Sequence, residues 1–247
     1  MRRLIAIPAR YGAQRLPAKP LLAETGRPLV RHVHDRAILA RGFAGVVVAT
    51  DDERIATAVR AFGGDVELTR ADHATGTERL AELALRRDAD IYVNVQGDEP
   101  EIEPGYIEQV ASLLDDGAAP MATLVCPLPE AHEQDPSVVK CVVSGNRALY
   151  FSRALVPHQR DLGGPKPARF QHLGIYAYTK AALGAWPSLP PSPLAQAESL
   201  EQLRALEAGW TIRVGVVPTA FPGIDTPADY AAFVARERAR ALTAAPP

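Results

Sequence analysis

The chain has 247 residues, 47% hydrophobic and 23% charged, which suits one large folded domain with a buried core. Its 27 Lys and Arg residues against 29 Asp and Glu residues give a formal net charge of −2, which argues against a nucleic-acid partner. No apolar run approaches the roughly 20 residues that span a bilayer, and the one after Met1 is too short for a signal peptide, so we expect a cytoplasmic protein with no membrane span.

Short apolar runs alternate with helical periodicity through the first half of the chain. The predicted strands are 3–7, 46–49, 65–68 and 91–95. The predicted helices are 28–41, with Leu29, Val33 and Ala37 on one face, a helix with Ile55, Val59 and Phe62 after capping-box spacing at 50–53, and 77–87. Helices between strands predict crossover connections and a mainly parallel sheet. Ligands bind at the carboxyl ends of strands in such sheets, so the loops after the strands are the candidate site.

The pattern changes after about residue 119. Four β-like runs follow with only loops between them, at 121–126, 138–143, 148–151 and 173–178. They predict an antiparallel or mixed insertion, which we interpret as a dimerisation element. The sequence has no repeat and no flexible interdomain linker. We therefore expect a single domain over 1–247 with an embedded β-rich arm at about 138–180.

The end of the chain returns to the α/β pattern. A helix is predicted over 198–208 and a strand over 211–217, and the last helix begins near Thr226, the expected N-cap, with Pro227 at its first position. Cys126 and Cys141 both lie in strand-like apolar runs. We expect two buried free thiols rather than a disulfide.

Three cations follow the first predicted strand. Arg10, Arg15 and Lys19 share a loop that Pro17 and Pro20 stiffen. Guanidinium forks and an ammonium point charge together suit a triphosphate. The alternative is a solvated basic loop. A Walker-type GxxxxGK[ST] motif and a GxGxxG motif are both absent from this loop, so neither a P-loop enzyme nor a dinucleotide enzyme is indicated.

Two acidic residues are candidate magnesium ligands. Asp98 directly follows the strand at 91–95, and Asp225 precedes Thr226. Magnesium usually takes one or two carboxylates and leaves its other positions to water and phosphate. Each aspartate alone is also a normal turn residue. Spacing along the sequence gives no reason to pair them.

Other polar residues are weaker candidates. Thr75 and Glu78 have capping-box spacing, whereas Arg79 stands near a helix start, where the helix dipole disfavours a cation and a bound anion would favour one. His172 and Tyr176 share one side of a strand, where packing is the simpler explanation. Glu201 and Gln202 read as ordinary helix residues.

Taken together, these segments resemble the 3-deoxy-manno-octulosonate cytidylyltransferases, also called CMP-Kdo synthetases. The motifs that carry the resemblance are IPARYGAQRLPAKPL, VATDDERI, DHATGTERLAE, VNVQGDEP, ALYFSRALVP, HLGIYAY, ESLEQLRAL and GIDTPADY, in the family's order from residue 5 to 230. Each motif is weak alone, and their common order makes the resemblance specific.

The resemblance implies a three-layer, glycosyltransferase-A-like α/β fold with a mixed, mostly parallel sheet and a homodimer. It implies transfer of CMP from CTP to the anomeric 2-hydroxyl of a 3-deoxy sugar acid of the Kdo type, with magnesium, for lipopolysaccharide biosynthesis. The alternative acceptor is a related 3-deoxy or amino-substituted sugar acid.

The family's functional residues carry over by position. CTP would be held by Ala9, Arg10, Arg15, Lys19, Thr75, Gly76 and Gln96. Asp98 and Asp225 would bind magnesium and act in catalysis together with Arg15 and Lys19. The sugar-acid pocket would be lined by Arg79, Gln96, His172, Tyr176, Glu201 and Gln202.

Some positions depart from the family pattern, and rival functions exist. Gln14 stands where Ser or Thr is common, Ala18 where Gly is common, and Glu101 where an apolar residue is usual. A CMP-sialic acid synthetase or a hexose-1-phosphate enzyme would share the basic loop, but HLGIYAY and ESLEQLRAL favour Kdo. The retained cations and aspartates argue against a non-catalytic nucleotide sensor.

Overall fold

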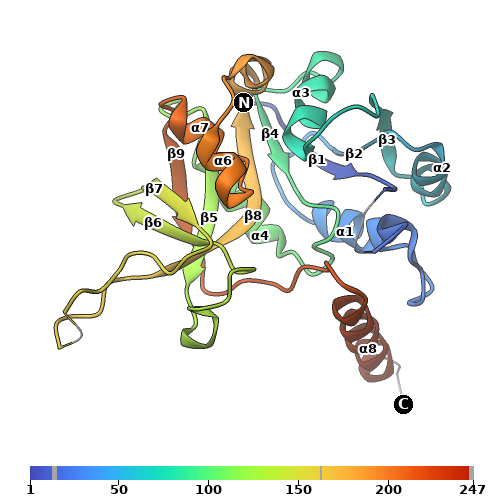
Figure 1. The fold of residues 1–247 in the computed structure, drawn as a ribbon. Helices are drawn as coiled ribbons and strands as arrows, with labels where there is room; N and C mark the ends of the chain where they lie inside the picture. The colour runs from blue at the N-terminus through green and yellow to red at the C-terminus, as the bar shows by residue number, and fades with distance from the viewer. Residues whose placement is uncertain (13–15, 162, 245–247) are drawn as a thin grey trace.

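A computed structural model describes residues 1–12, 16–161 and 163–244 (Figure 1). The strands are β1 (Arg3–Ala9), β2 (Val46–Thr50), β3 (Asp65–Leu68), β4 (Ile91–Asn94), β5 (Met121–Pro127), β6 (Lys140–Ser144), β7 (Arg147–Ser152), β8 (Phe170–Thr179) and β9 (Ile212–Val216). The α-helices are α1 (Leu29–Ala37), α2 (Glu53–Ala61), α3 (Gly76–Arg86), α4 (Pro104–Ser112), α5 (Lys180–Ala185), α6 (Pro193–Glu198), α7 (Gln202–Glu207) and α8 (Pro227–Ala244). Short 3-10 helices are η1 (Lys19–Leu21), η2 (Glu130–His132) and η3 (Trp186–Ser188).

The strands of the described residues form one mixed sheet in the order β3-β2-β1-β4-β8-β5-β9-β7-β6. Strands β3, β2, β1 and β4 pair in parallel, as the crossover pattern predicts. Strand β8 then lies antiparallel to both β4 and β5, and β9 lies parallel to β5. Antiparallel pairings of β7 with β9 and of β6 with β7 complete the sheet. The protein is therefore α/β with a parallel half and a mixed half.

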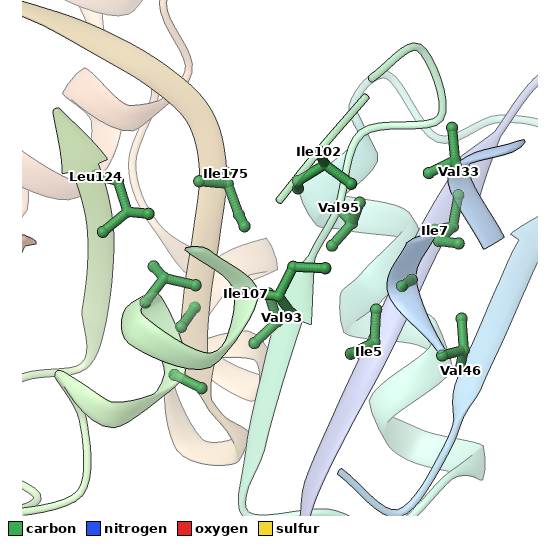
Figure 2. Close-up of a cluster of buried hydrophobic side chains, with 14 of the residues drawn as sticks. Ile5, Ile7, Val33, Val46, Val93, Val95, Ile102, Ile107, Leu124 and Ile175 are labelled. Carbon is green, nitrogen blue, oxygen red and sulfur yellow. The ribbon is translucent and has the colours of Figure 1, made fainter. Parts of the chain in front are cut away.

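Helices cover both faces of the sheet because the strand residues alternate between two apolar clusters. Ile5 and Ile7 of β1 face the cluster formed with α1, α2 and α4, part of which is drawn in Figure 2. Leu4 and Ala6 face the cluster formed with α3, α5 and α7. A third, smaller cluster joins α8 to the start of the chain and contains Leu16, Leu29, Ile224, Tyr230, Phe233 and Val234.

Several elements agree with the predictions made from local sequence patterns. The strand at 65–68 has the predicted bounds, and the α1 stripe of Leu29, Val33 and Ala37 is fully buried. Helix α8 begins after Thr226, whose hydroxyl accepts a hydrogen bond from the Asp229 N–H at 3.2 Å. Cys126 and Cys141 are buried free thiols, as expected. Within the described ranges, no helix is long and apolar enough to cross a membrane.

Two local predictions were wrong, and one helix was missed. The helix predicted over 198–208 is two helices, α6 and α7, because Ser199 adopts a left-handed conformation with φ 51° and ψ 49°. The N-cap of α2 is Asp52 rather than Thr50, since the Asp52 carboxylate accepts the Arg54 N–H at 2.9 Å. Helix α4 was not predicted, although Pro104 at its first turn and the buried Ile107, Val110 and Ala111 follow helical spacing.

The predicted insertion joins the main sheet. Strand β8 is shared, because residues 170 and 171 pair with β6 while Tyr176 to Thr179 pair with β4. The arm expected at about 138–180 therefore ends in a strand of the sheet interior. The segment between β7 and β8, golden in Figure 1, extends away from the body on the side opposite α8.

Candidate active site

A cleft of about 690 Å³ lies at the carboxyl ends of β1 and β4 and at the start of α3. This is the sheet edge at which the parallel topology predicts a ligand. The lining residues are Pro8, Ala9, Arg10, Gly12, Leu16, Lys19, Pro20, His73, Ala74, Thr75, Gly76, Arg79, Gln96, Gly97, Asp98, Ser199, Glu201 and Asp225. Most of the predicted site residues thus meet in one place, whereas Arg15 lies outside the described residues.

Two glycines allow the loops of the cleft to approach each other. A Cβ on Gly97 would lie 2.9 Å from the Pro8 carbonyl oxygen, and one on Gly76 would lie 3.3 Å from the Pro8 ring. The first distance excludes a side chain at Gly97 unless the backbone shifts, and the second would make a side chain at Gly76 a tight fit. Ala18, just before η1, has φ 55°, which explains why glycine is common there in the family.

Lys19 brings the two candidate metal ligands together. Its ammonium donates to Asp98 Oδ2 at 2.7 Å and lies 3.6 Å from Asp225 Oδ1. It also donates to the Ile224 carbonyl at 2.7 Å, and the Ile224 N–H donates to the Asp98 carbonyl at 2.9 Å. One small cation therefore reaches both carboxylates, which sequence spacing gave no reason to pair.

The donor set fits magnesium. The two carboxylates are partly exposed to the cleft, at 31% for Asp98 and 54% for Asp225. No cluster of three or more His, Cys, Asp or Glu side chains able to hold a metal occurs in the part of the chain that the structure describes. A pair of carboxylates facing a space large enough for phosphates is the arrangement that magnesium favours.

Glu99 lies beside this pair and was not predicted as a site residue. Burial raises the pKa of its carboxyl well above 4.5, and the charges of Asp98 and Asp225 raise it further. Its Oε2 atom is buried without a hydrogen-bond partner. Burial and the two neighbouring carboxylates thus both favour the neutral form of Glu99, and the sequence signal for it was its place next to Asp98.

The guanidinium of Arg79 has partners within the protein. It is 4% exposed, and its guanidinium donates to the Thr69 hydroxyl and, at 3.4 Å, to the Arg70 carbonyl. Asp51 supplies an anion at 3.4 Å. The cation near the helix start, from which we inferred a bound anion, thus has an internal carboxylate beside it while it also lines the cleft.

His73 is a lining residue that the sequence analysis missed. Its Nε2 lies 2.5 Å from Glu82 Oε2, and both side chains are nearly buried. Burial raises the pKa of Glu82, but hydrogen bonds from the Arg70 N–H and from His73 outweigh it and hold this pKa below its ordinary value. This histidine belongs to the motif DHATGTER, in which Thr75, Gly76 and Arg79 were predicted as site residues.

The remaining predicted residues form one wall, partly behind its surface. Glu201 lines the cleft and accepts the Thr77 hydroxyl at 2.7 Å, and burial raises the pKa of its carboxyl. Gln202 and Tyr176 are 2% and 5% exposed and do not line the cleft. His172 is also absent from the lining and lies 2.9 Å from the Thr123 hydroxyl.

Unpaired polar atoms gather around the cleft. Of the eight buried side-chain atoms without a hydrogen-bond partner among the described residues, five belong to residues that line it or adjoin a lining residue. They are Asn94 Nδ2, Glu99 Oε2, Glu201 Oε2, Gln202 Nε2 and Asp51 Oδ1, the last of which has the Arg79 guanidinium at 3.4 Å as an ion-pair partner. Buried polar atoms are almost always hydrogen-bonded in folded proteins. This concentration indicates a surface shaped for a polar ligand.

Comparisons with known proteins agree with this geometry. A family model described as Cytidylyltransferase matches residues 4–212. The 3-deoxy-manno-octulosonate cytidylyltransferase of Escherichia coli is 47% identical over 243 residues, which cover 98% of this chain and 96% of that protein. The enzyme of the same name from Syntrophotalea carbinolica is 51% identical over 234 residues, with 90% and 93% covered.

Solved structures are also similar. The structure of a CMP:2-keto-3-deoxy-manno-octonic acid synthetase complexed with CTP superposes with a TM-score of 0.93 and 46% identity, and the match covers 97% of this chain and all of that one. An inositol-1-phosphate CTP transferase from T. maritima has a TM-score of 0.63 at 15% identity, with 96% of each chain covered, which shows a common fold alone.

Proposed function

Because the chain belongs to the 3-deoxy-manno-octulosonate cytidylyltransferase family, we propose that it transfers CMP from CTP to the anomeric 2-hydroxyl of Kdo and releases pyrophosphate. The observation that carries the proposal is the meeting of Lys19, Asp98 and Asp225 in one cleft, surrounded by unpaired buried polar atoms. The carboxylate pair matches a metal bound with phosphates, and the unpaired atoms match a ligand rich in hydroxyl groups.

The nucleotide side of the cleft is built from the β1 loop and the start of α3. We assign CTP to Ala9, Arg10, Arg15, Lys19, Thr75, Gly76 and Gln96. The first turn of α3 supports this, since its backbone N–H groups and its dipole favour negative charge. Arg15 and Lys19 would stabilise the charge that develops on the leaving pyrophosphate.

We propose that Asp98 and Asp225 hold magnesium. A magnesium ion bound there would neutralise phosphate charge and lower the pKa of the attacking hydroxyl. The tie between the Ile224 N–H and the Asp98 carbonyl holds the two aspartates at one spacing. Lys19, which contacts both carboxylates, balances their charge and stands at the boundary between the metal ligands and the triphosphate.

We propose that the sugar acid binds against the opposite wall. The residues assigned to it are Arg79, Gln96, His172, Tyr176, Glu201 and Gln202. Arg79, Gln96 and Glu201 face the cleft, and the others support that wall from within the protein. The Glu201 Oε2 atom, which has no hydrogen-bond partner, would accept a hydroxyl group of the sugar, with Gln202 behind it. A related 3-deoxy or amino-substituted sugar acid is the alternative acceptor.

The remaining features of the proposal concern the whole protein. They are a glycosyltransferase-A-like fold in a single domain, a homodimer formed through the arm at about 138–180, a cytoplasmic location, and a product that supplies lipopolysaccharide synthesis. They rest on the family resemblance, and the continuous sheet with β6 and β7 at its edge is compatible with them.

The test is release of pyrophosphate from CTP plus Kdo, with and without magnesium. Parallel reactions contain sialic acid in place of Kdo, or another nucleoside triphosphate in place of CTP. We expect release only when CTP, Kdo and magnesium are present together. Turnover with a different sugar acid would move the specificity and keep the reaction. CTP binding without release from any acceptor would contradict the proposal and favour a nucleotide-sensing protein.

A further inference from the structure

The turn between α6 and α7 sets the position of one wall of the cleft. Ser199 lines the cleft in a left-handed conformation, at φ 51° and ψ 49°. Glu201 and Gln202 follow within one turn. A non-glycine residue in this conformation is sterically disfavoured, so it needs support from its surroundings. Hydrogen bonds of Arg153 and Glu198 hold this turn.

Arg153, the first residue after β7, donates hydrogen bonds to this turn. Its Nε donates to the Glu198 carbonyl at 2.7 Å, and its Nη2 donates to the Ser199 carbonyl at 3.3 Å. A third donor, Nη1, reaches the Pro136 carbonyl at 2.9 Å. The planar guanidinium thus joins the turn to the base of the arm with donors in fixed directions.

Glu198, on the turn itself, accepts hydrogen bonds from the end of β7 and from Arg153. Its carboxylate accepts the Ser152 hydroxyl at 2.7 Å and the Arg153 N–H at 2.9 Å. Behind it, the fully buried Lys140 donates to the carbonyls of Asp135 at 2.6 Å and Arg153 at 3.2 Å. Donors and acceptors therefore run without a break from the arm to the turn that carries the proposed sugar ligands.

We propose that Arg153 and Glu198 are positioning residues for the sugar acid, which hold Ser199 and Glu201 at the spacing that the acceptor requires. Neither residue lines the cleft, so both would act through the residues that do. The hydrogen bonds of Arg153 and Glu198 in the described residues go to the arm and to the α6–α7 turn and not to the loops of the nucleotide side, which separates the two substrates. This inference rests on the proposed function, because it concerns the second substrate of that reaction.

The experiment compares two conservative variants with two matched controls. Arg153→Lys keeps the charge and removes the fork, and Glu198→Gln keeps the shape and removes the charge. The control Arg169→Lys changes an arm arginine that pairs with Glu133 at 2.6 Å. The control Glu207→Gln changes the far end of α7, where the carboxylate accepts the Ser192 hydroxyl and the Leu194 N–H. KM for each substrate, kcat and the melting temperature are measured for all four.

We expect Arg153→Lys and Glu198→Gln to raise KM for the sugar acid about tenfold while KM for CTP stays within about twofold of the original. Both controls should leave both KM values unchanged. Equal rises in the two KM values, no rise in either, or the same rise in the controls would overturn the inference.

The two proposals fail in different ways. If the unaltered protein does not use Kdo, the proposed substrate is wrong, and the four variants are then compared with the sugar acid that it does use. If no acceptor supports turnover, the proposed function fails and the inference fails with it. If the unaltered protein turns over Kdo and the variants match their controls, the inference alone fails.

Discussion

Asp98 is the residue on which the chemistry of the cleft depends most directly. It lies next to the buried Glu99, accepts a hydrogen bond from the Ile224 N–H with its backbone carbonyl, and contacts the Lys19 ammonium with its carboxylate. The backbone contact shapes the loop, whereas the carboxylate supplies charge. A substitution that keeps the shape and removes the charge separates these two roles.

Asp98→Asn should reduce turnover at least about a hundredfold, because it removes charge where phosphate and metal charge must be balanced. The fold should be retained, since an amide of the same size leaves the backbone contact to Ile224 intact. Turnover is measured across a magnesium titration, with the melting temperature alongside. Asp88→Asn is the control, because Asp88 is an exposed aspartate that pairs with Lys180 outside the cleft. Near-normal turnover in Asp98→Asn would exclude the metal role.

His172 shows how burial selects one protonation state and one tautomer. The Thr123 hydroxyl has one proton, and it donates to the Ile175 carbonyl at 2.7 Å. It must therefore accept from His172 Nε2–H, at 2.9 Å. Phe151 packs edge-on against the imidazole at 4.9 Å, and burial lowers the His172 pKa from 6.5 to about 3. The ring is neutral, with Nδ1 as its acceptor.

This burial predicts a pH dependence of stability. The folded pKa of His172 is below the unfolded value, so between pH 6.5 and about 3 the unfolded chain binds a proton that the folded chain does not. The stabilisation is complete above pH 6.5 and is lost as the pH falls. In His172→Gln, the free energy of unfolding should fall with acidification by up to about 1.4 kcal/mol per pH unit less than in the original protein. Urea unfolding from pH 7 to 4.5 measures the free energy of unfolding of both proteins. The same dependence of this free energy on pH in both proteins would refute the prediction.

At the scale of elements, α8 is joined to the rest of the protein by a small set of contacts. Phe233 is 1% exposed and packs edge-on against His32 at 5.0 Å. The Glu101 carboxylate, which stands where the family usually has an apolar residue, accepts Arg236 at 2.6 Å and Arg240 at 2.7 Å from this helix. The departure from the family pattern is therefore matched by two arginines of α8.

Phe233→Ala should destabilise α8 more than the rest of the protein. Loss of the ring leaves a cavity in a cluster of few residues and costs about 3–5 kcal/mol. Because Asp225 lies just before α8, the variant should also need more magnesium for half-maximal activity. Hydrogen exchange is followed in peptides from α8 and from the β2–α2 region. Val59→Ala, in the larger core cluster, is the control. Equal acceleration in both peptides would contradict a local role for the ring.

The elements that sequence predicted well are those defined by local periodicity or by a cap. The parallel half, the buried face of α1, β3 and the start of α8 belong to this group, although α1 ends at Ala37 and not at the predicted residue 41. The break at Ser199 was missed because the residues on both sides of it form helices, and the hydrogen bonds from Arg153 come from a strand far away in the sequence. The shared strand β8 was missed because its two partners are also non-local.

The site divides in the same way. The cations of the first loop and Asp98 follow strands, and topology alone predicts that such residues reach one edge of the sheet. Pairing Asp225 with Asp98 needed the resemblance, because the contact through Lys19 and Ile224 leaves no trace in local spacing. Glu99 and His73 acquire their properties from burial and from Glu82, which the sequence alone does not reveal.

At the scale of the whole molecule, the cleft and the arm belong to one sheet. The carboxyl ends of β1 and β4 form the cleft, and five strands further along the sheet β6 forms its edge. Strand β8 connects the two regions, because it pairs with β4 near the cleft and with β6 at the arm. A partner bound at the arm would therefore contact a strand that also reaches the cleft.

The proposed homodimer can be tested on the half-exposed apolar residues of this end of the sheet. Leu149 of β7 and Val216 of β9 are 50% and 52% exposed, and burying such side chains against a second copy would stabilise association. Sedimentation equilibrium should give twice the chain mass of 26.5 kDa. Leu149→Glu should weaken the dimer at least about tenfold, because a carboxylate would be buried at the contact.

Leu85→Glu is the matched control, because Leu85 is 83% exposed on α3, away from the arm. It should leave the dimer unchanged, and circular dichroism should show both variants folded. A monomer at every concentration would contradict the dimer, and an unchanged dimer in Leu149→Glu would move the contact away from β7. If Leu149→Glu is monomeric and also has a raised KM for the sugar acid, then dimer formation through the arm helps Arg153 to hold the α6–α7 turn at the cleft. If it is monomeric with an unchanged KM, then the contacts of Arg153 and Glu198 within a single chain are enough to hold this turn.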